Sequence, residues 1–284
     1  MLEIRNLRKS FSSNEVLKEI NITIKKGEIV GLLGKNGAGK TTLIKSIMQL
    51  LKYDGEIYVD NQILTCKNLY KHISFLLEPS FLEYFTAFDN LKFLYGLNNK
   101  HNSEHTIIDA LEKVGLEDAK DKKIKKFSYG MKQRLGLAQS LMECFDFLIL
   151  DEPTVGIDPV GMKILDSQLR FLANTQNVGI LLSSHELDFI KNICDRVIIL
   201  ERGIIVENKK ISEIMSSYCI FLKSDYTEIL QKLQNTSLFT HKLVNKRTQV
   251  TIAESNLNKI LNLLVNEQIE IEKIALVEEL SNYF

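Results

Sequence analysis

The chain has 284 residues, of which 45% are hydrophobic and 25% are charged, an ordinary mixture for a folded globular protein. Its 36 Lys and Arg residues balance its 36 Asp and Glu residues, so the formal net charge is zero. A neutral chain is a poor candidate for broad nucleic-acid binding, because clustered positive charge supplies most of that affinity. The length predicts one large domain, or one large domain and a small one.

Cysteine spacing and hydropathy limit the cellular setting. The four cysteines, Cys66, Cys144, Cys194 and Cys219, fit no zinc or disulfide pattern and predict free thiols in a reducing compartment. The N-terminal residues lack the apolar segment of a secretory signal. No run approaches the roughly 18 apolar residues that span a bilayer. We therefore expect any membrane crossing to come from another chain.

Buried strands alternate with helical segments through the first 210 residues. Strands are expected at 20–24, 28–34, 54–61, 145–150, 180–184 and 196–200. Helical spacing after the second strand predicts a helix with one apolar face, made of Leu43, Ile44, Ile47, Met48, Leu50 and Leu51. Residues 80–140 are expected to be mostly helical. The alternation predicts an α/β fold with a mainly parallel sheet.

The pattern changes after about residue 210. The order there is strand, helix, strand, strand, helix, strand, which predicts a small ferredoxin-like α+β module (βαββαβ). We therefore expect two domains, at residues 1–210 and 211–284. The second carries no recognisable chemistry. It could regulate the first domain, support a dimer, or simply cap the core.

The stretch GKNGAGKTT, residues 34–42, matches the phosphate-loop pattern G-x-x-x-x-G-K-[ST] between a predicted strand and a predicted helix. Lys40 would reach the β- and γ-phosphates of a nucleotide, and the Thr41 hydroxyl would bind Mg²⁺. The alternative is a tight turn without a ligand. The predicted nucleotide-binding residues are Gly34, Lys35, Asn36, Gly37, Ala38, Gly39, Lys40, Thr41 and Thr42.

Two later strands end in polar side chains. Asp151 and Glu152 follow the strand in DFLILDEPT, where Asp151 would hold Mg²⁺ and Glu152 would act as general base on water. Two adjacent carboxylates can also be a solvated strand end. His185 follows the next strand, at the sheet edge where ligands bind, which favours a place near the γ-phosphate over a structural role.

These motifs, together with FSYGMKQR (127–134) and GIDP (156–159), resemble the nucleotide-binding subunit of ABC transporters in order and spacing over residues 1–210. The resemblance implies a P-loop NTPase with a RecA-like core, an antiparallel β part and a helical subdomain at about 80–140. It implies an ATPase that uses ATP and Mg²⁺. It also implies a homodimer, or a heterodimer with a similar ATPase, beside a separate multi-span permease, on the cytoplasmic face of the cell membrane.

The family's site is shared between two subunits. By resemblance, Ser128 and Gly130 would contact the partner's ATP, and Asp158 would communicate across the dimer. Phe11 stands where the family has an aromatic that stacks on adenine, although it could also be a core residue.

Two positions depart from the family pattern. Tyr129 replaces a glycine of the usual LSGGQ, which leaves the packing there open. Glu78 replaces the usual glutamine. By resemblance it would be a Mg²⁺ ligand and a member of the catalytic site.

A narrower resemblance concerns LLEPSF (76–81) and FSYGMKQRLGLA (127–138), which look like the ATPase subunits of bacterial exporters for bacteriocins, lantibiotics and bacitracin. It implies export of an antimicrobial peptide. The aromatic-rich residues 81–95 would be core or would line a groove for a permease helix. The lysines of 120–126 form either a solvated face or a positive field that attracts ATP.

A different class of function also fits the ATPase motifs. It is a soluble ABC ATPase acting on nucleic acid or ribosomes. Such relatives carry long coiled coils, zinc sites or two cassettes in one chain, and the sequence shows none of these. We therefore expect no nucleic-acid partner.

Overall fold

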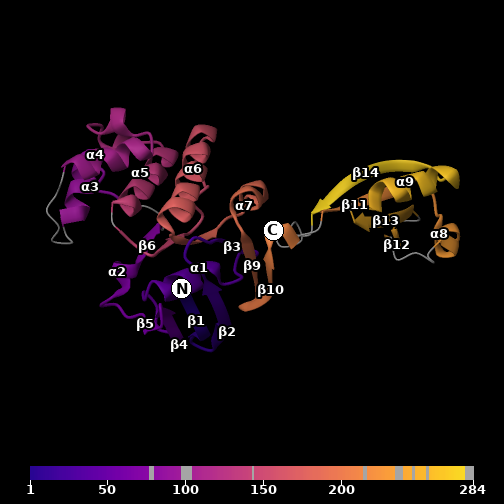
Figure 1. The fold of residues 1–284 in the computed structure, drawn as a ribbon, viewed down its shortest axis with the longest axis horizontal. Helices are drawn as coiled ribbons and strands as arrows, with labels where there is room; N and C mark the ends of the chain where they lie inside the picture. Colours follow the sequence, from indigo (N-terminus) through magenta and orange to yellow (C-terminus); the bar gives the residue numbers. More distant parts are fainter. Residues whose placement is uncertain are drawn as a thin grey trace. The chain divides into compact units, whose positions relative to one another are not determined.

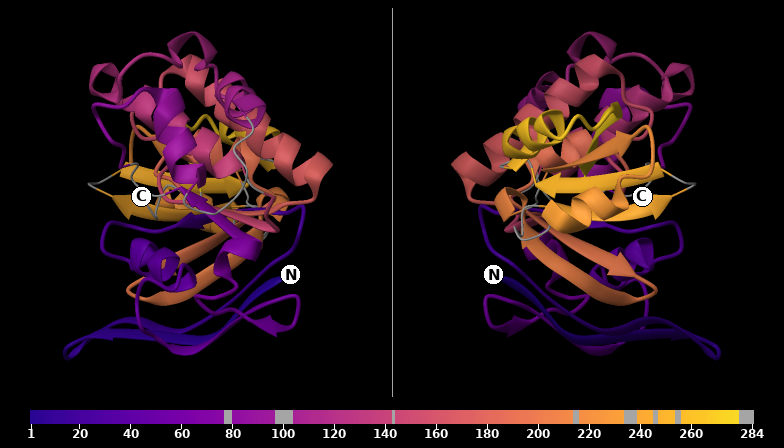
Figure 2. Two further views of the ribbon diagram at one scale, coloured as in Figure 1. Left: turned by 90° about the vertical axis from the view of Figure 1, so that its left-hand side faces the viewer. Right: turned by 90° about the vertical axis from the view of Figure 1, so that its right-hand side faces the viewer.

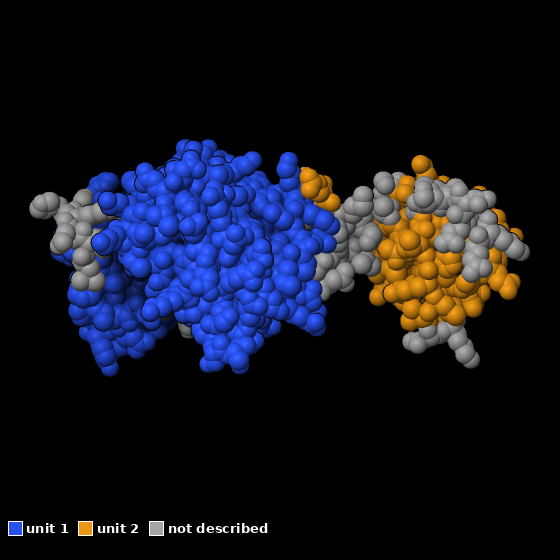
Figure 3. Space-filling view, turned by 90° about the horizontal axis from the view of Figure 1, so that it is seen from below, with its two compact units in different colours: residues 1–211 blue, residues 212–284 orange. Residues whose placement is uncertain are grey.

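The structure is a computed structural model that describes residues 1–76, 80–96, 104–142, 144–213, 216–233, 239–244, 247–253 and 256–278. The chain forms two compact units, Met1–Ile211 and Ser212–Phe284 (Figures 1 and 3).

The first unit contains a six-stranded, mainly parallel sheet. Its strand order is β10-β9-β3-β8-β7-β6, and only the β9–β10 pair is antiparallel. The strands are β3 (Ile29–Leu33), β6 (Ile73–Leu76), β7 (Phe147–Leu150), β8 (Gly179–Ser183), β9 (Arg196–Glu201) and β10 (Ile204–Lys210). Strands β3, β7 and β8 are buried along their whole length, as continuous apolar runs predict for a sheet covered on both faces.

A second, antiparallel sheet has the order β2-β1-β4-β5. Its strands are β1 (Leu2–Phe11), β2 (Asn14–Ile24), β4 (Asp54–Val59) and β5 (Gln62–Ile63). One hydrophobic core joins this sheet to β3 and to the helix after it, through residues such as Ile4, Leu32 and Ile44. This core fixes the phosphate loop between the two sheets.

Helices make up the rest of the first unit. They are α1 (Lys40–Ile47), α2 (Leu69–His72), α3 (Ala87–Gly96), α4 (Glu104–Lys113), α5 (Tyr129–Leu141), α6 (Pro159–Gln176) and α7 (Leu187–Ile193), with short 3₁₀ turns at Glu117–Ala119 and Ile124–Lys126. A further 3₁₀ turn, Ile211–Glu213, spans the sequence boundary between the two units. Helices α3, α4 and α5 pack together, and the views of Figures 1 and 2 agree that they lie at the opposite end of this unit from the antiparallel sheet. The predicted α/β architecture with a helical subdomain is confirmed.

The helix after the phosphate loop is shorter than its apolar pattern predicted. It ends at Ile47, and Gln49 adopts a left-handed φ of 59°. Leu50 is 57% exposed. The expectation that Leu50 and Leu51 continue the apolar face is therefore wrong, because the chain leaves the helix before it reaches them.

The second unit is a four-stranded antiparallel sheet with two helices. Its elements are β11 (Ser216–Leu222), α8 (Thr227–Leu233), β12 (Phe239–Val244), β13 (Arg247–Ala253), α9 (Leu257–Asn266) and β14 (Ile271–Glu278). The strand order β12-β13-β11-β14 and the βαββαβ succession are those of a ferredoxin-like module, as predicted. Leu230 of α8 and Ile260 of α9 share a core with Ile220, Val250 and Ile252 of the sheet.

Candidate functional site

The phosphate loop leaves the buried strand β3 and enters α1, as its sequence predicts. Gly34 has a φ of 149°, and a Cβ there would lie 2.2 Å from the carbonyl oxygen of Leu200. Gly39 caps α1 in the left-handed region, at a φ of 111°. Glycine at these two positions lets the backbone turn tightly, and amide groups at the start of a helix favour an anion.

A cleft of about 350 Å³ lies over this loop, within the range of small-molecule sites. Four segments of the chain meet there: the β2 strand, the phosphate loop, the loop after β7 and the loop after β8. The lining residues are Val16, Lys35, Asn36, Gly37, Ala38, Gly39, Lys40, Thr41, Thr42, Glu152 and His185. The fold therefore brings most of the predicted ATP-binding residues into one cleft, together with three predicted catalytic residues, Lys40, Glu152 and His185.

Lys40 is almost fully buried beneath the loop, with 7% of its surface exposed. Its Nζ donates a hydrogen bond to the carbonyl oxygen of Gly34. Burial lowers the pKa of Lys40, while the nearby Glu152 and Asp151 carboxylates oppose that shift. A buried ammonium needs negative partners, which the phosphates of a nucleotide would supply.

Asp151 lies where the phosphate loop meets the end of β7. Its Oδ2 accepts a hydrogen bond from Thr41 Oγ1 at 3.0 Å, and its Oδ1 accepts one from Ser183 Oγ at 2.6 Å. A carboxylate and a hydroxyl at this separation are the hard oxygen ligands that Mg²⁺ prefers. The described residues contain no group of three or more His, Cys, Asp and Glu that could hold a metal. Such a set suits Mg²⁺ held by one carboxylate and the phosphates of a substrate rather than by a protein cage.

Glu152 faces the cleft under backbone strain, at a φ of 51°. Its side chain is 24% exposed, and His185 Nε2 lies 3.0 Å from its Oε1. Among the described residues, no hydrogen bond to either buried carboxylate oxygen meets strict geometric criteria, although the backbone N–H of His185 lies close enough to favour the charged form. Burial raises the pKa of Glu152, against the charges of His185 and Lys40. Strain and a raised pKa at one carboxylate are typical of a catalytic base.

Ser128 and Gly130, at the start of α5, lie outside the residues that line this cleft. Ser128 is the N-cap of α5, and its Oγ accepts a hydrogen bond from the amide of Met131 at 3.2 Å. Asp158 is the N-cap of α6, and its Oδ1 accepts one from the amide of Gly161 at 2.9 Å. None of the three predicted in-trans residues lines the described cleft.

The structure describes Phe11 but does not describe Glu78. Phe11 ends β1 with 46% of its surface exposed, so it is not a core residue, and it is not among the described residues that line the cleft. Lys9 Nζ lies 4.7 Å from the centre of its ring. Glu78 lies outside the described residues.

Sequence reasoning missed the serines that hold the acidic strand end. Ser183 and Ser184 are buried, at 0% and 1% exposure. Ser183 Oγ accepts a hydrogen bond from the amide of Glu152 at 2.9 Å, and Ser184 Oγ lies 3.0 Å from Thr154 Oγ1. The signal was present as two hydroxyl residues at the end of an otherwise apolar strand.

The family model for ABC transporters matches residues 17–155. The chain is 33% identical over 302 residues to the bacitracin transport ATP-binding protein BcrA of Bacillus licheniformis, covering all of this chain and 96% of that protein. It is 35% identical over 245 residues to the lantibiotic transport ATP-binding protein SrtF of Streptococcus pyogenes, covering 85% of this chain and 99% of that protein. Neither relative is described as acting on nucleic acid.

Solved structures agree with these relatives. A dimeric, post-hydrolysis structure of the ATP-binding cassette MJ0796 bound to ADP and Pi aligns with a TM-score of 0.67 at 25% identity, covering 74% of this chain and 99% of that one. CbiO1 of Clostridium perfringens, part of the ABC transporter complex cbiONQ, aligns with a TM-score of 0.65 at 29% identity, covering 75% and 89%. Among the described residues, no helix is both long enough and apolar enough to cross a membrane. The chain belongs to the ABC transporter family, as an ATP-binding subunit with the ATPase fold and activity of that family.

Proposed function

We propose that this chain hydrolyses ATP to drive a separate membrane permease that exports an antimicrobial peptide or a similar compound. The single observation that carries the ATPase part is the cleft that joins the phosphate loop to Glu152 and His185. The export part is supported by the names of the bacitracin and lantibiotic relatives. The protein would then work on the cytoplasmic face of the cell membrane.

The chain's own residues divide the chemistry among them. Lys40 and the loop amides hold the phosphate chain, and Glu152 accepts a proton from the attacking water. His185 lies beside Glu152 and orients it towards the terminal phosphate.

Mg²⁺ fits the oxygen ligands of Thr41 and Asp151. When bound, the ion supplies positive charge that neutralises the phosphates. We also propose Glu78 as a ligand of the Mg²⁺ ion. We propose that Phe11, which is exposed at the end of β1, stacks on the adenine.

A dimer completes the site. Ser128 and the amide of Gly130 stand at the N-terminus of α5, where backbone N–H groups favour an anion. In a head-to-tail pair these groups contact the ATP held by the partner subunit, and Asp158 lies at the same interface. ATP then holds the two subunits together, and its hydrolysis releases them. The partner is a second copy of this chain or a similar ATPase.

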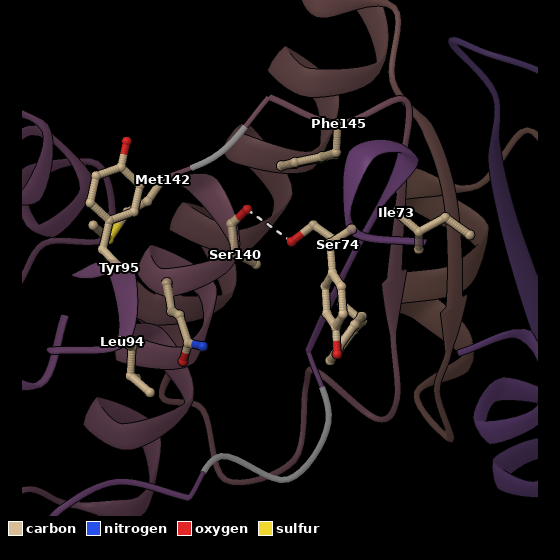
Figure 4. A pocket seen from close by; sticks show the side chains of 10 residues that line it. Ile73, Ser74, Leu94, Tyr95, Ser140, Met142 and Phe145 are labelled. Atoms are coloured by element: carbon tan, nitrogen blue, oxygen red, sulfur yellow. Dashed lines mark hydrogen bonds between the residues drawn. The ribbon is translucent and has the colours of Figure 1, made fainter. Parts of the chain in front are cut away.

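A groove between the parallel sheet and the helices α3 and α5 suits the permease contact (Figure 4). It has a volume of about 120 Å³ and combines apolar and aromatic side chains from β6, α3 and the region after α5. Its labelled residues are Ile73, Ser74, Leu94, Tyr95, Ser140, Met142 and Phe145. A short amphipathic helix of a permease would dock there by inserting apolar anchors.

The ATP hydrolysis proposed here requires no residue of the C-terminal unit. We propose the domain division at residues 1–210 and 211–284, with the second domain acting as a regulator, a dimer support or a cap. Deleting residues 212–284 and measuring ATPase activity and dimerisation separates these roles. Only a loss of ATPase activity without a loss of the dimer indicates regulation.

The experiment that tests the proposal is purification of a tagged Glu152→Gln variant in ATP from gently solubilised membranes of the native cell. Slow hydrolysis should trap the ATP-bound dimer with its permease, so a protein with several membrane spans should co-purify. A Lys40→Ala variant is the matched control, because it should not hold ATP and should therefore not form the ATP-bound dimer. Recovery of ribosomes or nucleic acid without a membrane protein would refute the transport function.

A further inference from the structure

The aromatic ring of Tyr129 packs directly on the loop that follows the catalytic glutamate. A Cβ at Gly156 would lie 2.3 Å from Cδ1 of Tyr129 and 3.0 Å from Cε1, so the ring occupies the space of a side chain there. Gly156 has a φ of 68°. The Tyr129 hydroxyl accepts a hydrogen bond from Gln133 Nε2 at 3.1 Å, which holds the ring on its own helix.

A second contact joins the same two segments one residue further along α5. A Cβ at Gly130 would lie 2.6 Å from the carbonyl oxygen of Gly156 and 3.4 Å from Cα of Ile157. The N-terminus of α5 therefore packs closely against the loop, through Gly130, Gly156 and the ring of Tyr129. Interlocked segments of this kind move together or repack as a unit.

The loop is short and internally bonded. The amide of Val155 donates to the carbonyl of Glu152 at 3.3 Å, and the amide of Ile157 donates to the carbonyl of Thr154 at 3.2 Å. Asp158 then caps α6. Gly156 is four residues from Glu152 and two from Asp158. A shift of the Tyr129 ring would therefore move both residues through the consecutive turns of this loop.

We propose that Tyr129 is a positioning residue that couples the two ATP sites of the dimer. It ties the surface that contacts the partner's ATP, Ser128 and Gly130, to the loop that carries Glu152 in its own site. Arrival of the partner's phosphate at α5 would thereby set the position of the general base. This inference rests on the proposed in-trans role of Ser128 and Gly130.

The test uses the purified full chain in the Glu152→Gln background and measures ATP-dependent dimerisation by light scattering, with binding of a fluorescent ATP analogue to the monomer as a separate readout. Gly156→Ala should weaken dimerisation about tenfold, the size of effect expected for residues in direct contact. Combining it with Tyr129→Gly should restore dimerisation to the level of Tyr129→Gly alone, because the ring that meets the new methyl group is gone.

Controls separate the contact from backbone strain and from folding. Gly115→Ala introduces the same kind of strain, at a φ of 66°, but would meet only the side-chain ends of Ile164 and Arg134. Tyr129→Phe keeps the ring and should dimerise like the parent. In the chain that keeps Glu152, the ATPase rate should depend on ATP concentration less cooperatively in Tyr129→Gly. Tyr129→Phe should leave this cooperativity unchanged.

Three results overturn the inference. One is a Gly156→Ala variant that dimerises as well as Gly115→Ala. Another is a double variant whose defect is the product of the two single defects, because independent effects mean that the ring and the glycine are not coupled. The third is unchanged cooperativity in Tyr129→Gly. If the parent Glu152→Gln chain itself fails to dimerise in ATP, the proposed function fails instead.

Discussion

Replacing Glu152 by glutamine should slow ATP hydrolysis and at the same time stabilise the first unit. Loss of a general base costs about 10²- to 10⁴-fold in turnover. The stability gain follows from the site: the side chain is 24% exposed but both carboxylate oxygens are buried, the backbone φ is 51°, and burial raises the pKa of Glu152. A glutamine keeps the size and the backbone but removes the buried charge. Its amide still lacks good hydrogen bonds, so we expect the lower part of the usual range, about 1 kcal/mol.

The pH dependence of this gain has a definite sign. Because burial raises the pKa of Glu152 above 4.5, the folded state favours the protonated form and loses stability as the pH rises through that pKa. The penalty is present in the wild type at pH values above the folded-state pKa of Glu152, and it is absent from the glutamine variant. The gain should therefore shrink as the pH is lowered towards 4.5, where the protonated Glu152 becomes a neutral isostere of glutamine.

Thermal unfolding followed by circular dichroism measures this difference, because the chain has no tryptophan to report on folding. For a unit of this size, 1 kcal/mol shifts the Tm by about 2–4 °C. Glu186→Gln is the matched control, since that glutamate is exposed and should change neither Tm nor turnover. A Glu152→Gln variant that is less stable at neutral pH, or one that retains wild-type turnover, would refute the reasoning.

Further predictions concern the cleft and the opposite end of β7. Phe11→Trp would place a single tryptophan at the end of β1; ATP should quench or shift its fluorescence, and an unchanged spectrum would remove Phe11 from the adenine site. Ser183→Ala removes a hydrogen bond to Asp151 and should raise the Mg²⁺ concentration for half-maximal ATPase activity about 10- to 100-fold, whereas Ser184→Ala should not. Burial opposes ionisation of Asp146, but hydrogen bonds from His72 and Lys26 outweigh it and lower its pKa, so its contribution to stability is present above pH 3.8 and lost as the pH falls below. Asp146→Asn should cost about 1–2 kcal/mol in urea unfolding at pH 7, and a cost that persists unchanged in acid would contradict this sign.

The phosphate loop was predictable because it is local. Its glycines, Lys40 and Thr41 lie within nine consecutive residues, and the strand and helix on either side have clear apolar patterns. The βαββαβ order of the second unit was predictable for the same reason. Where a pattern ran past the end of an element, as at Leu50, hydropathy alone did not reveal the left-handed turn that ends α1.

Contacts between distant segments were not predictable from spacing. The strand β6 is only four residues long and lacks a distinct pattern, yet it pairs with β7 and forms one wall of the groove in Figure 4. The sequence left the packing at Tyr129 open, because the local hydrogen bond from Gln133 does not show which distant segment the ring packs against. Its partner, Gly156, lies 27 residues away, and only the fold brings them together.

The most direct measurement of the shared ATP site is complementation between two defective chains. In the Glu152→Gln background, a Lys40→Ala chain cannot hold its own ATP, and a Ser128→Arg chain cannot contact the ATP of a partner. Each should remain monomeric alone in ATP. Mixed, they leave one intact site, built from the phosphate loop of one chain and the α5 N-terminus of the other, so ATP should produce a mixed dimer in light scattering. If the mixture stays as monomeric as its components while the Glu152→Gln parent dimerises, Ser128 does not act across the dimer.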